Sequence, residues 1–372
     1  MPKIITVYIN GTDEPDDFAS TRTSRLRSSF RTSLANVLNK LTMQDQNNIS
    51  ICLDGCGINN PYIRDLSAIF TWNLENQVND LVKKIKEQMG SEKIILNLYG
   101  FSRGGAGVYL LAKKLKDVDP AQLEMNILAF EPVPGNFIYN VYVDKFFGLN
   151  LTLSSLISDL SDCKSLKRVQ SLYTNEPLPD IDCHAPILPA FSSACEHQAD
   201  VIPGCHKNAE SFQVIYNSNI QKYDVKHSNI QSGITFHIVV DFLKKCGTSF
   251  DFDKMNLSEE LKDSNHLPKL YNQYVATNRL QPMTRSMHFS NAIKTAPLNS
   301  NRFLNLNEQS QHDEIMDPSN NALSIKDYNP TPSYTNGQKS AARIVYPALA
   351  FSATICVLAK DNKLSNIFKP NL

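Results

Sequence analysis

Apolar residues follow two different periods along the first 250 residues of the chain. Short apolar runs predict strands, and segments with apolar residues every three or four positions predict helices. The predicted strands are 4–9, 49–53, 94–98, 125–130 and 168–173. The predicted helices are 21–41, 72–89, 108–115 and 234–246. Because strands and helices alternate, the pattern predicts an α/β fold, with a mostly parallel sheet flanked by helices.

This regular pattern is interrupted once and then ends. Residues 137–166 are rich in large apolar side chains with few charges, which fits either a lid inserted over an apolar substrate or a pair of core helices. Beyond a domain at 1–250 we expect a helical extension over 251–293 and a flexible polar linker over 294–340. Residues 341–372 form a C-terminal apolar segment and tail.

Within that tail, residues 344–359 form an uncharged apolar run. The run is shorter than the roughly 17–25 residues that span a bilayer, and Pro347 lies inside it. We therefore expect a buried hairpin or helix here. Peripheral contact with a membrane is the alternative.

The amino-acid composition bears on the partner and on the location of the protein. Lys plus Arg and Asp plus Glu are equal at 37 each, so no net charge favours a nucleic acid partner, and none is expected. The eight cysteines are scattered, and a strand pattern begins at Lys3 in place of a signal peptide, so we expect reduced thiols and a cytoplasmic location.

Three cysteine–histidine pairs raise the question of a metal. They are Cys183 with His184, Cys195 with His197, and Cys205 with His206. Their spacing matches no tetrahedral zinc pattern, and adjacent Cys-His pairs rarely both reach one ion. We therefore predict no metal site and no cofactor. His237 lies in an apolar helix and is expected to be a core residue.

The strongest chemical signal is a Gly-x-Ser-x-Gly sequence centred on Ser102. A predicted strand ends just before it and a predicted helix begins just after it, which is the setting of a nucleophile elbow. Gly100 and Gly104 remove the side chains that would clash in so sharp a turn. The pattern therefore predicts Ser102 as a catalytic nucleophile, with an ordinary serine in a glycine-rich turn as the alternative.

A nucleophilic serine needs a base and an acid that orients the base. In α/β hydrolases these follow the serine in the order acid, then histidine. Glu131 ends the strand after the elbow strand and His206 follows further on, so we predict Ser102, Glu131 and His206 as the triad. Asp180 and Asp182, after the next strand, are the alternative acids.

An oxyanion hole requires backbone N–H groups near the nucleophile. Arg103, directly after the serine, is expected to supply one. The loop after the first strand is expected to supply the other from Gly11 or Thr12, unless these residues form only a plain Asn-Gly turn.

Several short motifs resemble those of the type VI secretion lipase-like α/β hydrolases. The elbow at 100–105 is similar to the family's Gly-Phe-Ser-Arg-Gly-Ala sequence, and 8–12 and 53–57 are similar to its first two strand ends. Pro203-Gly204-Cys205-His206 resembles the Pro-Gly-x-His segment of the family's catalytic histidine. The similarity covers about residues 1–250 and departs from the family pattern at Glu131, where an Asp is usual, and after the histidine, at 207–210.

The resemblance implies an acyl-ester hydrolase, with the phospholipase activity of characterised members and a lipid or other acyl ester as substrate. It also implies delivery as a bacterial effector, secreted without a cleaved signal peptide. Two alternatives stay open. One is a thioesterase or deacylase that acts on acylated protein. The other is an inactive hydrolase scaffold that binds a partner, in which Ser102, His206 and an acid would not converge.

Overall fold

The computed structural model describes most of the first 298 residues. The described residues are 2–12, 29–56, 74–90, 92–134, 153–176, 186–206, 208, 210–277, 283–289 and 292–298. All statements on structure below concern these residues.

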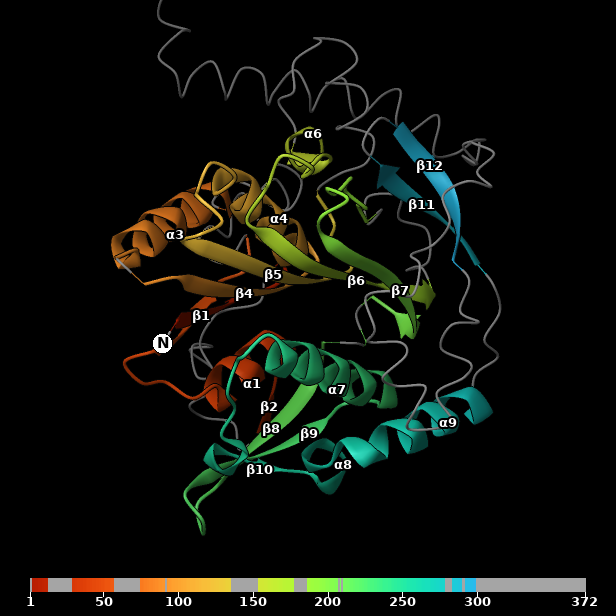
Figure 1. Ribbon diagram of the computed structural model, residues 1–372. Coiled ribbons are helices and arrows are strands. Elements are labelled where there is room, and N and C mark those ends of the chain that lie inside the picture. Colours follow the sequence, from red (N-terminus) through yellow and green to blue (C-terminus); the bar gives the residue numbers. More distant parts are fainter. Residues whose placement is uncertain are drawn as a thin grey trace, which may run out of the picture.

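A six-stranded sheet forms the centre of the molecule (Figure 1). Its order is β3 (Asn48–Leu53), β1 (Lys3–Ile9), β4 (Ile94–Phe101), β5 (Leu123–Phe130), β6 (Leu166–Glu176) and β7 (Glu196–Cys205). Every neighbouring pair is parallel, so the carboxyl ends of all six strands meet at one edge. The predicted α/β class, with a mostly parallel sheet flanked by helices, is confirmed.

Helices cover both faces of this sheet (Figure 1). One face carries α3 (Leu74–Gln88), α4 (Arg103–Lys114) and the short α6 (Leu153–Ile157), and the other carries α1 (Leu34–Leu41) and α7 (Ile230–Lys245). Each face has its own apolar core, because successive side chains of a strand point to opposite sides.

A second sheet lies beyond α1 and α7. It has the order β10 (Asn256–Leu257), β9 (Lys222–His227), β8 (Phe212–Asn217) and β2 (Ser29–Thr32). Side chains of both sheets share one core with α7, so this helix is buried between them. After β9 and α7 the chain forms short elements in the order η3 (Phe252–Lys254), β10, α8 (Glu259–Lys262), η4 (Ser264–His266) and α9 (Leu267–Thr277), where η marks a 3-10 turn. A separate hairpin follows, in which β11 (Met283–Phe289) pairs with β12 (Ala292–Leu298).

Two predicted elements are wrong in part. The helix predicted over 21–41 begins only at Leu34, where Ser33 caps it, and Ser29–Thr32 forms β2 because it pairs with β8, far away in the chain. The extension predicted as helical over 251–293 contains α8 and α9, but its end forms β11.

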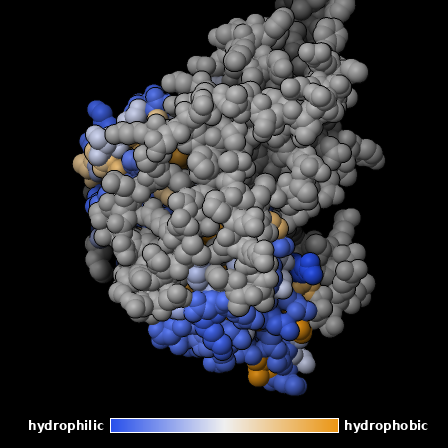
Figure 2. All heavy atoms as spheres, turned by 90° about the vertical axis from the view of Figure 1, so that its right-hand side faces the viewer, coloured by the Kyte–Doolittle hydropathy of each residue, from blue (hydrophilic) through white to orange (hydrophobic). Residues whose placement is uncertain are grey.

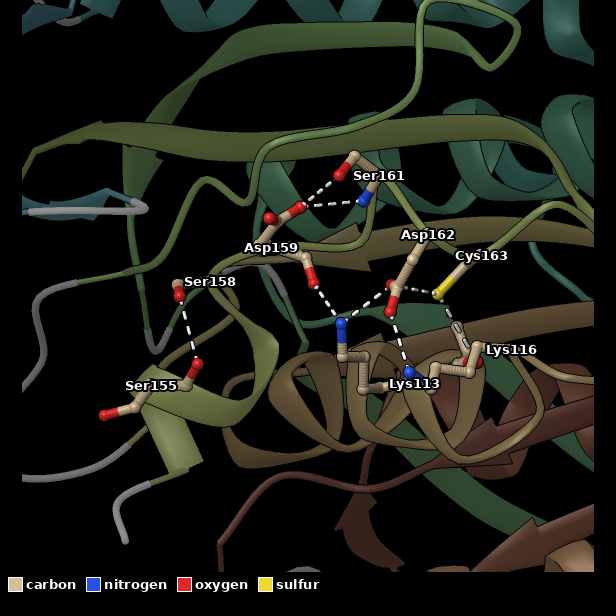
Figure 3. Close-up of polar contacts among 9 residues, drawn as sticks. Lys113, Lys116, Ser155, Ser158, Asp159, Ser161, Asp162 and Cys163 are labelled. Carbon is tan, nitrogen blue, oxygen red and sulfur yellow. Dashed lines mark hydrogen bonds and ion pairs between the residues drawn. The ribbon is translucent and has the colours of Figure 1, made fainter. Parts of the chain in front are cut away.

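The second half of the apolar segment 137–166 lies in the core. Leu153, Ile157 and Leu160 are buried, and α6 packs against α4. The turn that follows is tied to the end of α4 (Figure 3). Lys113 Nζ donates to Asp162 Oδ1 at 2.7 Å and Lys116 Nζ donates to Asp162 Oδ2 at 2.9 Å. The remaining part of the predicted lid, 137–152, lies outside the described residues.

On the side of the molecule drawn in Figure 2, the described residues of the lower part, where α8 and α9 lie, are mostly hydrophilic with a few separate apolar spots. Among the described residues, no helix has the length and apolarity of a membrane span. The linker 294–340 lies almost wholly outside the described residues, as do 341–372 and with them the apolar run 344–359.

Candidate active site

Ser102 occupies a strained turn between β4 and α4. Its φ of 54° and ψ of −116° lie in a region that residues with side chains rarely adopt. The turn is held by its backbone, since Ser102 N–H donates to Phe130 O at 2.9 Å. A Cβ on Gly104 would lie 2.0 Å from Ile9 O, and one on Gly100 would lie 2.2 Å from Gly104 O. The two glycines are therefore required by close backbone approach, as the elbow motif predicts.

His206 follows β7 and reaches the serine. Its Nε2 lies 3.0 Å from Ser102 Oγ, although 104 positions separate the two residues. The ring packs against Phe101, with 4.7 Å between ring centroids, and is 5% exposed. β7 runs to Cys205 because it pairs with β6. The histidine therefore stands on the end of a strand, which fixes its backbone.

Glu131 lies on the other side of the histidine ring. Its Oε2 is 3.0 Å from His206 Nδ1, and its Oε1 accepts the Thr174 N–H at 2.5 Å. The side chain is 0% exposed, and the residue itself has a positive φ of 48°. The structure thus joins Ser102, His206 and Glu131 in one hydrogen-bonded line. Asp180 and Asp182 lie outside the described residues.

The hydrogen bonds of Glu131 assign the tautomer of His206. An ionised carboxylate only accepts hydrogen bonds, so Nδ1 carries the proton and Nε2 presents its lone pair to Ser102 Oγ. In this tautomer the imidazole can take the serine proton. The carboxylate would then stabilise the positive charge that forms on the ring.

The predicted oxyanion donors lie around the elbow. Arg103 is the first residue of α4, where N–H groups have no acceptor within the helix and the helix dipole favours negative charge. Gly11 directly follows Asn10 at the end of β1, and a Cβ on it would lie 2.7 Å from the Phe101 ring. Thr12 Oγ1 lies 3.4 Å from Cys56 Sγ. The function of these N–H groups as an oxyanion hole stays a prediction.

The side chain of Arg103 makes a contact that the sequence does not predict. Arg103 Nη1 donates to Val133 O at 2.8 Å, and Val133 N–H donates to Ser102 O at 2.9 Å. These two bonds tie the segment that carries Glu131 to the elbow that carries the serine.

The cysteine–histidine pairs do not form a metal site among the described residues, in which no group of three or more possible ligands comes together. Both ring nitrogens of His206 are engaged with the serine and the glutamate, and His197 Nδ1 lies 3.3 Å from Cys195 O. Cys183 and His184 lie outside the described residues. His237 is a buried residue of α7 whose Nε2 lies 2.6 Å from Glu260 O, in keeping with the predicted core position.

Comparisons with known proteins give only distant similarities. No family model and no curated protein sequence matches the chain. Among solved structures, an uncharacterized protein from Pseudomonas aeruginosa matches with a TM-score of 0.43 and 12% identity, over 76% of this chain and 51% of that one. The Tle1 effector bound to the VgrG spike of the type 6 secretion system matches with a TM-score of 0.32 and 17% identity, over 56% and 50%.

A third solved structure is Est1E from Butyrivibrio proteoclasticus, with a TM-score of 0.34 and 12% identity, over 66% of this chain and 88% of that one. The chain spans about half the length of the first two structures. At TM-scores below 0.5, these similarities carry no conclusion about the chemistry of this chain.

Proposed function

We propose that this protein is a serine hydrolase that cleaves carboxylic esters, with Ser102 as nucleophile, His206 as base and Glu131 as the acid that orients the base. One observation supports the proposal above all others. Three residues from the ends of three strands form a continuous line of two hydrogen bonds, each 3.0 Å long, with His206 between Ser102 and Glu131. An inactive scaffold would not require this convergence, so the geometry favours an enzyme over a binding protein.

In the first half of the reaction, Ser102 Oγ attacks the ester carbonyl while His206 Nε2 takes the hydroxyl proton. The carbonyl oxygen becomes an oxyanion, held by the N–H of Arg103 and that of Gly11 or Thr12. The intermediate then collapses. The bond to the alcohol oxygen breaks, His206 gives its proton to that oxygen, and an acyl group stays on the serine.

The second half repeats the same steps with water. His206 takes a proton from the attacking water, and a second tetrahedral intermediate forms at the acyl carbon. When it collapses, the serine oxygen leaves and takes the proton back from His206. The products are a carboxylic acid and free enzyme, so no cofactor is needed.

For the substrate, we propose a lipid or other acyl ester, with a lipase or phospholipase as the leading activity. The resemblance of the elbow and of the Pro-Gly-x-His segment to the lipase-like type VI secretion hydrolases supports this choice. Delivery as an effector is proposed from the same resemblance, and peripheral contact with a membrane is proposed from the apolar run 344–359. A thioesterase or deacylase uses the same triad, so it is the second candidate.

Labelling with a fluorophosphonate probe tests the activity. The folded wild type should be labelled and Ser102→Ala should not. Ser211→Ala should react like wild type, because the Ser211 hydroxyl donates to Ser228 Oγ, outside the proposed triad. Absence of labelling in well-folded wild type would refute the proposal. Phospholipids and acyl thioesters, offered side by side, then separate a lipase from a thioesterase by their kcat/KM values.

A further inference from the structure

We propose that Gln231 is a positioning residue that holds the backbone of His206 in register with the serine and the acid. The inference rests on the proposed function and adds a residue to it. Gln231 lies in the first turn of α7 and is 2% exposed. Its Oε1 accepts the Cys205 N–H at 3.1 Å, and its Nε2 donates to Cys205 O at 3.0 Å. One side chain thus engages both backbone groups of the residue before His206.

The position of β7 in the sheet explains this contact. β7 is an outer strand, so one side of its backbone has no neighbouring strand in this sheet. The N–H and C=O of one strand residue point to the same side, and the planar amide of Gln231 offers them an acceptor and a donor, as another strand would. A buried amide is costly unless it is hydrogen-bonded, and here both its ends are satisfied.

A second contact holds the chain on the far side of the histidine. Asn229 Nδ2 donates to Asn208 O at 2.8 Å, while Asn229 Oδ1 accepts the Ser232 N–H and caps α7. Two side chains at the start of α7 therefore bind the backbone on both sides of His206, at Cys205 and at Asn208. Because α7 is buried between two sheets, it is a rigid base for these contacts.

The functional consequence concerns alignment. His206 Nε2 must stay within hydrogen-bond reach of Ser102 Oγ while His206 Nδ1 stays within reach of Glu131. These two hydrogen bonds of the ring change during the reaction, so they alone do not hold the ring in place. Contacts on the Cys205 backbone do not change during the reaction. A misplacement of about 1 Å in a catalytic group can cost roughly 100-fold in rate.

The test replaces Gln231 by methionine, which keeps the length of the side chain and removes both hydrogen bonds. The matched control is Thr235→Val, a buried polar-to-apolar change one turn further along α7, where Thr235 Oγ1 bonds only within the helix, to Gln231 O. We expect Gln231→Met to lower the rate constant of fluorophosphonate labelling by about 10- to 100-fold with unchanged probe affinity. Thr235→Val should stay within about twofold of wild type.

A spectroscopic readout separates positioning from stability. The Nδ1–H of His206, hydrogen-bonded to Glu131, should give a low-field proton resonance that His206→Ala removes. This resonance should broaden or vanish in Gln231→Met and persist in Thr235→Val. If Gln231→Met does not fold, Gln231→Glu, which still accepts the Cys205 N–H but cannot donate to Cys205 O when ionised, should label at least about threefold more slowly than wild type.

The outcomes are distinct. No labelling of wild type or of any variant would refute the proposed function itself. Labelled wild type with equally fast labelling of Gln231→Met, or of the folded Gln231→Glu, would overturn the positioning role. An equal loss of rate in Gln231→Met and Thr235→Val, with the resonance retained in both, would overturn it too.

Discussion

Replacing Glu131 by glutamine should invert the tautomer of His206. The carboxylate now satisfies two donors, the Thr174 N–H at Oε1 and the His206 Nδ1–H at Oε2. Glutamine has one oxygen and one NH₂ group, so it can satisfy only one of them. If the oxygen stays on the Thr174 N–H, the NH₂ group faces Nδ1. The proton of His206 then moves to Nε2, and the ring can no longer accept the serine proton.

The magnitude follows from the opposite rotamer of the amide. With its oxygen toward Nδ1, the variant would place the NH₂ group against the buried Thr174 N–H, and an unsatisfied buried donor costs about 1–3 kcal/mol. The productive tautomer would then occur in roughly one molecule in 5 to 150. The variant also lacks the negative charge that stabilises the imidazolium. Together these losses should reach about 10³–10⁴-fold in kcat, the scale seen when the acid of a serine protease triad becomes an amide.

Pre-steady-state labelling and hydrolysis of a soluble ester both measure this loss. The controls are Asp180→Asn and Asp182→Asn, which should keep wild-type rates because the carboxylate that meets His206 is that of Glu131. Equal melting temperatures for Glu131→Gln and wild type would show that the loss is chemical. A rate within about threefold of wild type in Glu131→Gln, or a 10³-fold loss in either aspartate variant, would refute the tautomer argument.

Two further predictions concern packing and charge. Gly104→Ala should prevent native folding, measured by far-ultraviolet circular dichroism and labelling, because its Cβ would lie 2.0 Å from Ile9 O, whereas Gly90→Ala should be neutral since no atom lies within 4 Å of the added Cβ. Asp162→Asn should lower the free energy of unfolding in urea by less than about 1 kcal/mol at pH 7, because its two lysine partners are partly exposed. Although partial burial opposes the shift, bonds from these lysines lower the pKa of Asp162 to about 2. The native pKa is below the unfolded value of about 3.9, so ionised Asp162 contributes fully to the free energy of unfolding above about pH 4, and this contribution is lost as the pH falls toward 2. A difference in unfolding free energy between wild type and Asp162→Asn that stays constant down to pH 3 would contradict this prediction.

The elbow and the position of Glu131 as a candidate acid could be predicted from the sequence, because each depends on local pattern. An apolar strand, two glycines and a helix define the turn at Ser102, and the order of strands along the chain places Glu131 at the same sheet edge. The choice between Glu131 and the two aspartates could not be made in this way, because it depends on which carboxylate reaches the histidine ring.

The missed features depend on partners far away in the chain. Within Ser29–Thr32, Phe30 continues the helical spacing of the apolar residues that follow, yet this segment forms a strand because it pairs with β8. The sequence predicts only a backbone function for Arg103, and Gln231 lies before the helix predicted at 234–246. Only the fold brings the side chains of these residues to Val133 and Cys205. Side chains that support a site leave little local pattern, because their function is set by the backbone they meet.

The most direct test of the central claim is the location of the covalent adduct. Trypsin cuts after Lys93 and Arg103, and the peptide 94–103 contains Ser102 as its only serine. After reaction of the folded protein with a fluorophosphonate, mass spectrometry should find one phosphonyl group per chain, on this peptide and on Ser102. An adduct on any other residue, or none on folded wild type, would contradict the account.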